Sequence, residues 1–192
     1  MSGHHPWPPP HKRVAIVIPT YSASQALCDV AMATGKGWRE LADDLICVDD
    51  VDYCGDLIEI ADVFICNRNK GVAVNVNLGW KLALERGADY VAMMDMDCSW
   101  VEGSLRKACV PGYVAVPSLL QFPEAVNIGP MFIVPKEVST EYGFLDERGG
   151  DWKNKWFDAD YQVRVFGVLT QVRSLRVDHP GGIITGVKPQ HL

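Results

Sequence analysis

The chain has 192 residues, 48% of them hydrophobic and 22% charged, which is ordinary for a globular protein and enough for one well-buried domain. Its net charge of −6 argues against nucleic-acid binding and against an anionic membrane surface, because both partners need a broad basic face. The six cysteines show no Cys-x-x-Cys spacing, and neither a stretch of transmembrane length nor a signal peptide is visible. We therefore expect a cytoplasmic protein with reduced thiols and no stable membrane insertion.

The first half of the chain alternates between strand-like and helix-like patterns. Residues 1–12 are rich in proline and histidine, and we expect them to form a flexible tail. Continuous apolar runs predict buried strands at 14–18, 45–48, 63–66 and from Tyr90 toward Asp95. Helices are expected between these runs, from Ser22 or Ser24 to the glycines at 35 and 37, then over 57–61 and 72–86. This alternation favours an α/β fold with a mostly parallel, doubly wound sheet and helices on both faces.

The second half is less regular. Helices are expected at 101–108, 136–142 and 156–168, and strands at 112–116, 128–134 and 170–177. Residues 144–155 are rich in glycine and charge, which predicts a loop. We expect the strands of this half to form a smaller mixed sheet, and residues 181–192 to form a mobile tail or lid.

Three predicted strands end in polar residues at the same edge of the sheet, in the segments 19–21 (PTY), 49–50 (DD) and 95–97 (DMD). Ligands of open α/β sheets bind at this edge. Asp95 and Asp97 lie two positions apart and point the same way in an extended chain, which suits Mg2+ or Mn2+ and the phosphate oxygens that such a cation holds. An isolated Asp-x-Asp is more often a solvated turn, so the prediction of a nucleotide site depends on the three segments together.

Individual side chains at this edge suggest individual roles. Tyr21 could stack on a base, and Asp50 could accept a hydrogen bond from a ring N–H. Asp95 could reach a ribose hydroxyl, while Asp97 could hold the cation on a diphosphate. Taken singly, Tyr21 is equally compatible with packing over a core, and the Asp49-Asp50 pair with a turn.

Six segments, in chain order, resemble the motifs of family 2 glycosyltransferases with a GT-A fold: 14–21 (VAIVIPTY), 48–50 (VDD), 69–79 (NKGVAVNVNLG), 95–97 (DMD), 144–147 (FLDE) and 158–164 (DADYQVR). The resemblance implies a single GT-A-type domain over 13–180, with a nucleotide-binding half at 13–100 and an acceptor and catalytic half at 101–180. It implies inverting transfer of one sugar from a nucleotide-diphosphate donor, UDP-linked by preference, to an acceptor hydroxyl. The acceptor class stays open between protein, glycan and lipid.

The resemblance also assigns roles to residues of this sequence. A divalent cation, Mn2+ or Mg2+, would be held by Asp95, Asp97 and His179. The donor-binding residues would be Pro19, Thr20, Tyr21, Asp50, Asn69, Gly71, Asn77 and Asp95. Asp158 would be the general base, with Asp160 as the runner-up. Weaker candidates for contact with the acceptor or the sugar are Trp152, Trp156 and Asp160.

Several of these residue types also occur in purely structural roles. Acids in the first turn of a helix are favoured by the helix dipole, a single histidine near the end of a chain is often only solvated, and tryptophans often belong to a core. Phe157 stands where the family usually has Glu, and Val76 where many members have a basic residue. Two alternatives therefore stay open: a nucleotidyltransferase of similar sheet architecture, and a catalytically decayed sugar-nucleotide-binding protein. The first of these would be expected to carry a glycine-rich basic loop after its first strand, which this sequence lacks.

Overall fold

The computed structural model describes residues 11–51, 55–68, 70–124, 126, 128–147 and 157–179. These residues form an α/β fold built on one mixed eight-stranded sheet of order β3-β2-β1-β4-β7-β6-β8-β5. The strands are β1 Val14–Thr20, β2 Asp44–Asp49, β3 Val63–Cys66, β4 Tyr90–Met94, β5 Ser99–Gly103, β6 Val114–Leu119, β7 Met131–Pro135 and β8 Leu169–Asp178. The helices are α1 Gln25–Arg39, α2 Val72–Glu85, α3 Leu105–Ala108, α4 Lys136–Tyr142 and α5 Phe157–Arg164, with short 3-10 helices η1 Gly55–Glu59 and η2 Phe166–Val168.

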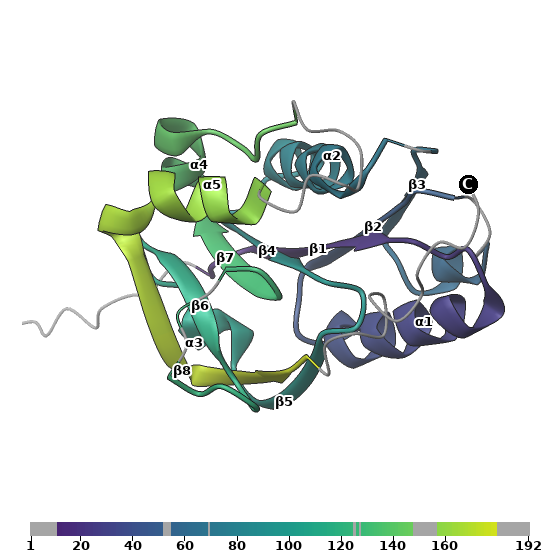
Figure 1. Cartoon of the computed structure of the whole chain (residues 1–192), viewed down its shortest axis with the longest axis horizontal. Coiled ribbons are helices and arrows are strands. Elements are labelled where there is room, and N and C mark those ends of the chain that lie inside the picture. Colours follow the sequence, from purple (N-terminus) through teal and green to yellow (C-terminus); the bar gives the residue numbers. More distant parts are fainter. Residues whose placement is uncertain are drawn as a thin grey trace, which may run out of the picture.

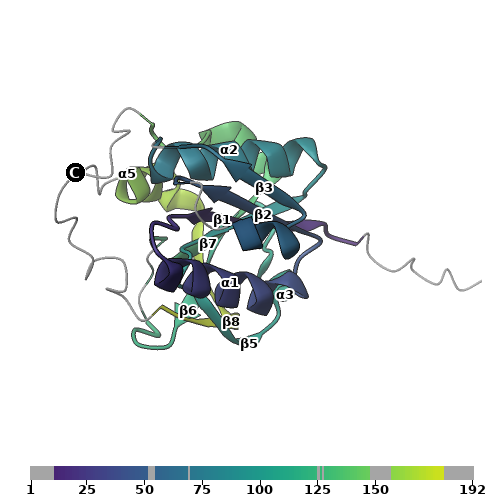
Figure 2. The ribbon, with the colours of Figure 1, turned by 90° about the vertical axis from the view of Figure 1, so that its right-hand side faces the viewer.

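Helices cover both faces of the sheet (Figure 1). Alternate residues of a strand point to opposite faces, so β1 supplies Val14, Ile16 and Ile18 to one apolar core and Ala15 and Val17 to the other. Helices α1 and α3 cover the first core, and α2, α4 and α5 cover the second. Figure 2 shows α1 and α2 on opposite sides of β1 and β2. Within the described ranges, every helix is too short or too polar to span a bilayer.

The strand directions bring distant parts of the chain to one edge of the sheet. β3, β2, β1 and β4 run parallel to one another, so their carboxyl ends lie together. β7 is antiparallel to both β4 and β6, which makes β6 run in the direction of β4, and β8 is parallel to β6. The carboxyl end of β8 therefore lies on the same edge as the carboxyl end of β4. We call this edge the carboxyl edge.

The predicted α/β class is confirmed, but the strands expected in a separate smaller sheet extend the main sheet instead. β7 pairs directly with β4 along its whole length, with Tyr90 opposite Pro135 and Met94 opposite Met131. All five residues of β7 are buried, so this strand completes both cores at the side of β4. The result is one continuous sheet whose second half is mixed.

Two helix predictions were wrong in part. The helix expected over 101–108 is confirmed only in its second half, as α3; residues 101–103 belong to β5, because Trp100 and Gly103 pair with Val177 and Leu175 of β8. Helix α1 does not end at Gly35 but continues to Arg39. A Cβ atom at Gly35 would lie 2.5 Å from Cδ1 of Ile60, so this glycine allows close packing inside the helix.

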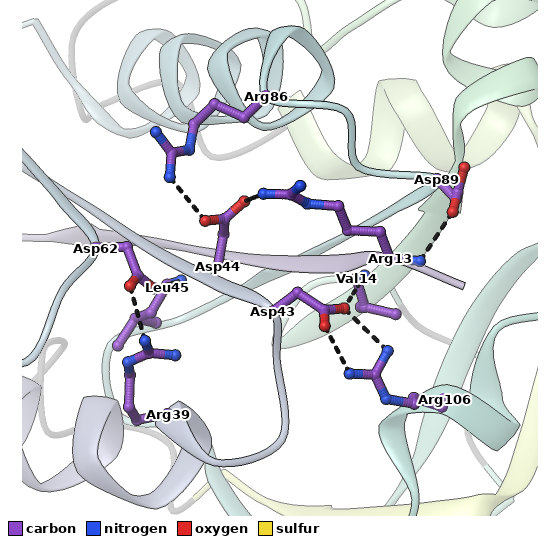
Figure 3. A network of polar contacts seen from close by, with 10 residues as sticks. All are labelled: Arg13, Val14, Arg39, Asp43, Asp44, Leu45, Asp62, Arg86, Asp89 and Arg106. Atoms are coloured by element: carbon purple, nitrogen blue, oxygen red, sulfur yellow. Dashed lines mark hydrogen bonds and ion pairs between the residues drawn. The ribbon is translucent and has the colours of Figure 1, made fainter. Parts of the chain in front are cut away.

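The opposite edge of the sheet, where β1 and β2 begin, is held by ion pairs (Figure 3). Asp44 accepts hydrogen bonds from Arg13 at 2.7 Å and from Arg86 at 2.8 Å. Asp43 pairs with Arg106 through both carboxylate oxygens, each at 2.9 Å. Burial opposes the ionisation of Asp44, but Arg86 and Arg13 outweigh it and hold the pKa of this carboxyl below its ordinary value. These contacts fasten the start of β2 to β1, α2 and α3.

Candidate metal and nucleotide site

A tight turn after β4 carries Asp95 and Asp97. The Asp95 N–H donates to the carbonyl of Pro130 at 2.9 Å, and the Cys98 N–H donates to the carbonyl of Asp95 at 3.0 Å. The indole Nε1 of Trp38, a fully buried residue of α1, donates to the carbonyl of Cys98 at 2.8 Å. Hydrogen bonds from separate parts of the chain thus fix this segment, which we call the Asp95–Cys98 turn.

His179 follows β8 directly and reaches the same place. Its Nε2 lies 3.3 Å from Oδ2 of Asp95 and 3.2 Å from Oδ1 of Asp97. Each of the three residues offers one potential ligand atom, and these atoms lie within 4.8 Å of one another. Oδ1 of Asp97 is buried and accepts no hydrogen bond from any described residue, which leaves it an electron pair for a cation. Two carboxylates and an imidazole are a donor set that suits Mn2+, so the cluster fits the predicted metal.

The charged groups of this cluster alter one another's protonation. Asp95 and Asp97 together raise the pKa of His179 to about 10. The part of the Asp95 carboxyl that is shielded from water raises the pKa of this group against the opposing effect of His179, and the charges of Asp97 and Asp158 raise it further. Asp158 therefore lies within electrostatic reach of Asp95, although it comes from α5. The Asp95 side chain is 41% exposed, so the cluster opens to solvent.

At the end of β1, the predicted donor-binding residues Pro19 and Thr20 are buried. The hydroxyl of Thr20 donates to Oδ1 of Asp49 at 2.8 Å. Ser22 donates to the same carboxylate twice, from its N–H at 3.2 Å and from its hydroxyl at 2.7 Å. The hydroxyl of Thr20 thus helps to position Asp49, and the contact of Thr20 with the donor stays a prediction. Tyr21 lies between Thr20 and Ser22 in the sequence and stays partly exposed at the carboxyl edge.

Asp50 follows β2 and is also buried. Its Oδ1 accepts hydrogen bonds from the N–H groups of Lys70 at 2.8 Å and Gly71 at 3.1 Å, and from the Asn75 amide at 2.9 Å. Gly71 has a φ of 84°, which favours glycine, and it caps the start of α2. One oxygen of Asp50 is thus committed to the start of α2, which leaves the predicted contact with a base to Oδ2.

Asn77 lies in α2 and was predicted to bind the donor, but its amide is committed elsewhere. Its Nδ2 donates to the carbonyl of Leu145 at 2.9 Å and to Glu147 at 2.8 Å, and its Oδ1 accepts from the Leu145 N–H at 3.0 Å. The residue is 1% exposed. Asn77 therefore holds residues 145–147, the segment expected on the acceptor side, against α2, and its contact with the donor stays a prediction.

The first turn of α5 carries Asp158 and Asp160. Oδ2 of Asp160 pairs with Nε of Arg164 at 3.0 Å, whereas Asp158 Oδ1 accepts the N–H of Ala159 at 2.8 Å. Arg164 also donates to the carbonyls of Tyr142 and Phe144, so α5 is fastened to the segment that Asn77 holds. Of the remaining predicted site residues, Asn69, Trp152 and Trp156 lie outside the described residues.

Several residues of the site were not anticipated from the sequence. They are Trp38 at the Asp95–Cys98 turn, Ser22 after β1, and Asn75 beside Asp50. Asp49, the last residue of β2, and Met96 lie in segments expected at this edge, but their contacts were not anticipated. A buried polar residue at a strand end, such as Asp49 after the apolar run 45–48, was the one available signal, because such a group needs donors.

No protein-family model and no curated protein sequence matches this chain. Solved structures do match its fold. The mannosyltransferase PcManGT from Pyrobaculum calidifontis, in complex with GDP-Man and Mn2+, superimposes with a TM-score of 0.63 at 14% identity, over 89% of this chain and 58% of that one. S. aureus TarS 1-349 in complex with UDP-GlcNAc gives a TM-score of 0.65 at 11% identity, over 88% of this chain and 59% of that one.

The chain thus spans less than two thirds of the length of these structures, and 36% of a longer TarS structure. Identities of 11–14% show the fold alone. The mixed sheet, its carboxyl edge and these superpositions together show that the chain has the GT-A fold of these glycosyltransferases.

Proposed function

We propose that this protein is a metal-dependent, inverting glycosyltransferase that moves one sugar from a nucleoside diphosphate, preferably UDP, to an acceptor hydroxyl. The observation that carries the proposal is the cluster of Asp95, Asp97 and His179 at the carboxyl edge. Two structures of the same fold, which bind GDP-Man with Mn2+ and UDP-GlcNAc, support a nucleotide sugar as the donor. None of the described cysteines forms a disulfide, which supports a cytoplasmic location.

Asp95, Asp97 and His179 would hold Mn2+ or Mg2+ in this proposal. A bound divalent cation would neutralise the negative charge that develops on the departing nucleoside diphosphate. The three residues suit this task because two come from one fixed turn and the third from the end of β8, so their positions are set by the sheet. On the described part of the chain, the exposed side of Asp95 is where phosphate oxygens would approach.

Asp158 is the proposed general base. It accepts the proton of the acceptor hydroxyl while that oxygen forms a bond to the anomeric carbon and the bond from this carbon to the diphosphate oxygen breaks. Attack on the face opposite the leaving group inverts the configuration. Asp158 is preferred to Asp160 because Asp160 is paired with Arg164, whereas Asp158 lies in the electrostatic environment of Asp95.

The base of the donor would lie between Tyr21 and Asp50. Tyr21 offers a ring at the end of β1, and Asp50 offers Oδ2 to a ring N–H. Gly71 donates its N–H to Asp50, and its positive φ lets the backbone turn tightly at the start of α2. The contacts that Asp49 makes to Thr20 and Ser22 keep the loop that carries Tyr21 against β2.

A donor screen tests the proposal. Release of nucleoside diphosphate is measured from UDP-, GDP- and dTDP-sugars, each with Mn2+ and with EDTA. We expect release from one donor, dependent on Mn2+, and loss of this release in Asp97→Asn. Equal weak release from all three donors with and without metal would contradict the proposal.

A further inference from the structure

Met96, the residue between the two metal-site aspartates, makes a polar contact that the proposed chemistry does not use. Its Sδ accepts a hydrogen bond from the backbone N–H of Tyr21 at 3.3 Å. Met96 is 2% exposed, so the contact is shielded from water. A thioether sulfur is a weak acceptor, yet here it accepts from a main-chain donor in the loop after β1. The side chain therefore joins the Asp95–Cys98 turn to that loop.

The two segments joined by Met96 have different tasks in the proposed site. The Asp95–Cys98 turn carries the metal ligands and is fixed by Pro130 and Trp38. The loop after β1 carries Tyr21, which would face the base, and it is fixed to β2 through Asp49. Met96 is thus a direct side-chain link from the metal side of the site to its base side.

We propose that Met96 is a positioning residue that sets the separation between the metal-binding turn and the base-binding loop, so that one nucleotide can contact both. This inference rests on the proposed function, because it assigns the loop and the turn to the two ends of a nucleoside diphosphate. It goes beyond that function by assigning a role to the residue between the two aspartates. A methionine fits the role because its unbranched side chain reaches across the gap and fills it with apolar atoms.

Met94 supplies a matched control. It is two residues earlier, also 2% exposed, and belongs to the same apolar core as Met96. Leucine replaces methionine in a core at similar volume, so Met94→Leu and Met96→Leu carry comparable packing costs. Only Met96→Leu removes the acceptor of the Tyr21 N–H. If Met96 only packed in the core, the two variants should show similar changes in exchange and in nucleotide affinity. If Met96 positions the loop, only Met96→Leu should show these changes.

Hydrogen exchange followed by mass spectrometry tests the contact without any ligand. We expect peptides that contain Tyr21 to exchange about two- to threefold faster in Met96→Leu than in wild type, because a weak hydrogen bond to the backbone N–H is lost. Met94→Leu should exchange at these peptides as wild type does. Unchanged exchange in Met96→Leu would overturn the inference.

Nucleotide titrations test the role. UDP, GDP and dTDP are titrated by calorimetry in the presence of Mn2+, and we expect the affinity of the nucleotide that wild type binds to fall about three- to tenfold in Met96→Leu, with Met94→Leu unchanged. In turnover, the donor KM should rise while kcat stays within about twofold. Wild-type affinity in Met96→Leu would overturn the inference and leave the proposed function intact. Wild-type protein that binds none of UDP, GDP and dTDP in the same titration would overturn both.

Discussion

Oδ1 of Asp97 lies 3.2 Å from Nε2 of His179, and the two residues come from opposite halves of the chain. One is on the turn after β4, and the other follows the last strand, β8. The carboxylate oxygen is buried, and the raised pKa of His179 makes the imidazole its positively charged neighbour, so a bound metal ion would take the place of the imidazole proton between the two residues.

The first prediction concerns this pair. Asp97→Asn should lower the affinity for Mn2+ by about tenfold or more, since it removes a charged ligand from the cluster. A bound ion stabilises the folded state. Mn2+ should therefore raise the Tm of wild type, and at a concentration too low to load the weakened site it should leave the Tm of Asp97→Asn unchanged. Differential scanning fluorimetry over a series of Mn2+ concentrations measures the Tm shift of each protein and, from its concentration dependence, the affinity. Asp29→Asn, an exposed aspartate of α1, is the control, and an equal Tm shift in Asp97→Asn would contradict the prediction.

The second prediction concerns the base. Asp158→Asn should lower kcat by about 10²- to 10⁴-fold, the usual range for a general base, while the affinity for the donor nucleotide stays near that of wild type. Asp160→Asn should lower kcat by less than about tenfold, because Asp160 pairs with Arg164. Steady-state kinetics measures kcat, and calorimetry measures the affinity for the donor nucleotide, in both variants. A larger loss in Asp160→Asn would move the base to that residue.

The third prediction separates the two roles considered for Asn77. Asn77→Ala leaves the buried N–H and carbonyl of Leu145 without their partner, so we expect a loss of about 2–4 kcal/mol in the free energy of unfolding. Nucleotide affinity should change by less than about twofold in the folded fraction. Urea denaturation and calorimetry provide the two measurements. If stability were kept and nucleotide affinity fell, Asn77 would be a donor-binding residue after all.

The fourth prediction concerns Tyr161 of α5, which is fully buried in an aromatic cluster with Trp80 and Phe132. No described residue hydrogen-bonds its hydroxyl. Tyr161→Phe should therefore leave the stability unchanged or raise it by up to about 1 kcal/mol, since it removes a polar group that has no partner among these residues. Tyr161→Ala should cost about 3–5 kcal/mol through the cavity it leaves. Chemical denaturation of both variants measures the difference, and a clear loss in Tyr161→Phe would reveal a partner of the hydroxyl.

The fifth prediction concerns acid stability. Arg86 and Arg13 hold the pKa of Asp44 below its ordinary value in the folded protein, against the effect of burial. The ionised carboxylate therefore stabilises the fold fully above the pKa of the unfolded chain, about 3.9, and this contribution is lost as the pH falls through the lower folded value. Asp44→Asn should cost about 1–2 kcal/mol near neutral pH.

This difference between wild type and Asp44→Asn should begin to shrink below about pH 4, where the unfolded chain takes up a proton, and should be lost only below the lower pKa of the folded protein, where the native carboxylate is protonated as well. Urea denaturation across this pH range gives the comparison. Asp29→Asn, whose carboxylate is exposed and bonded to Gln25, should show no such pH-dependent difference. A constant difference for Asp44→Asn at all pH values would contradict the linkage.

β1, β2 and β4 could be predicted because both of their faces are buried. Runs such as 14–18 and 45–48 are apolar throughout, and this pattern needs no knowledge of partners. β5 could not be predicted, since all five of its residues are exposed and its identity as a strand comes from pairing with β8. The end of α1 was missed for a similar reason: only the position of Ile60 explains Gly35.

The candidate metal ligands were accessible from the sequence because their chemistry is specific, whereas the hydrogen-bond partners of buried polar groups were not. Thr20 and Asn77 are polar residues in the right segments, but the sequence does not reveal that Asp49 and Leu145 occupy them. The role of Met96 could not be foreseen because its contribution runs through a sulfur atom with no charge. Such commitments depend on contacts between residues far apart in the chain.

The position of β8 also bears on how the protein is made. This strand is the last in the described part of the chain, yet it inserts between β6 and β5, which are synthesised earlier. Among the described strands β5 pairs only with β8, so it joins the sheet only after translation has passed residue 178. His179 emerges directly after β8, so the third of the proposed metal ligands is added only after every described strand has been made, and the proposed site would be complete only then.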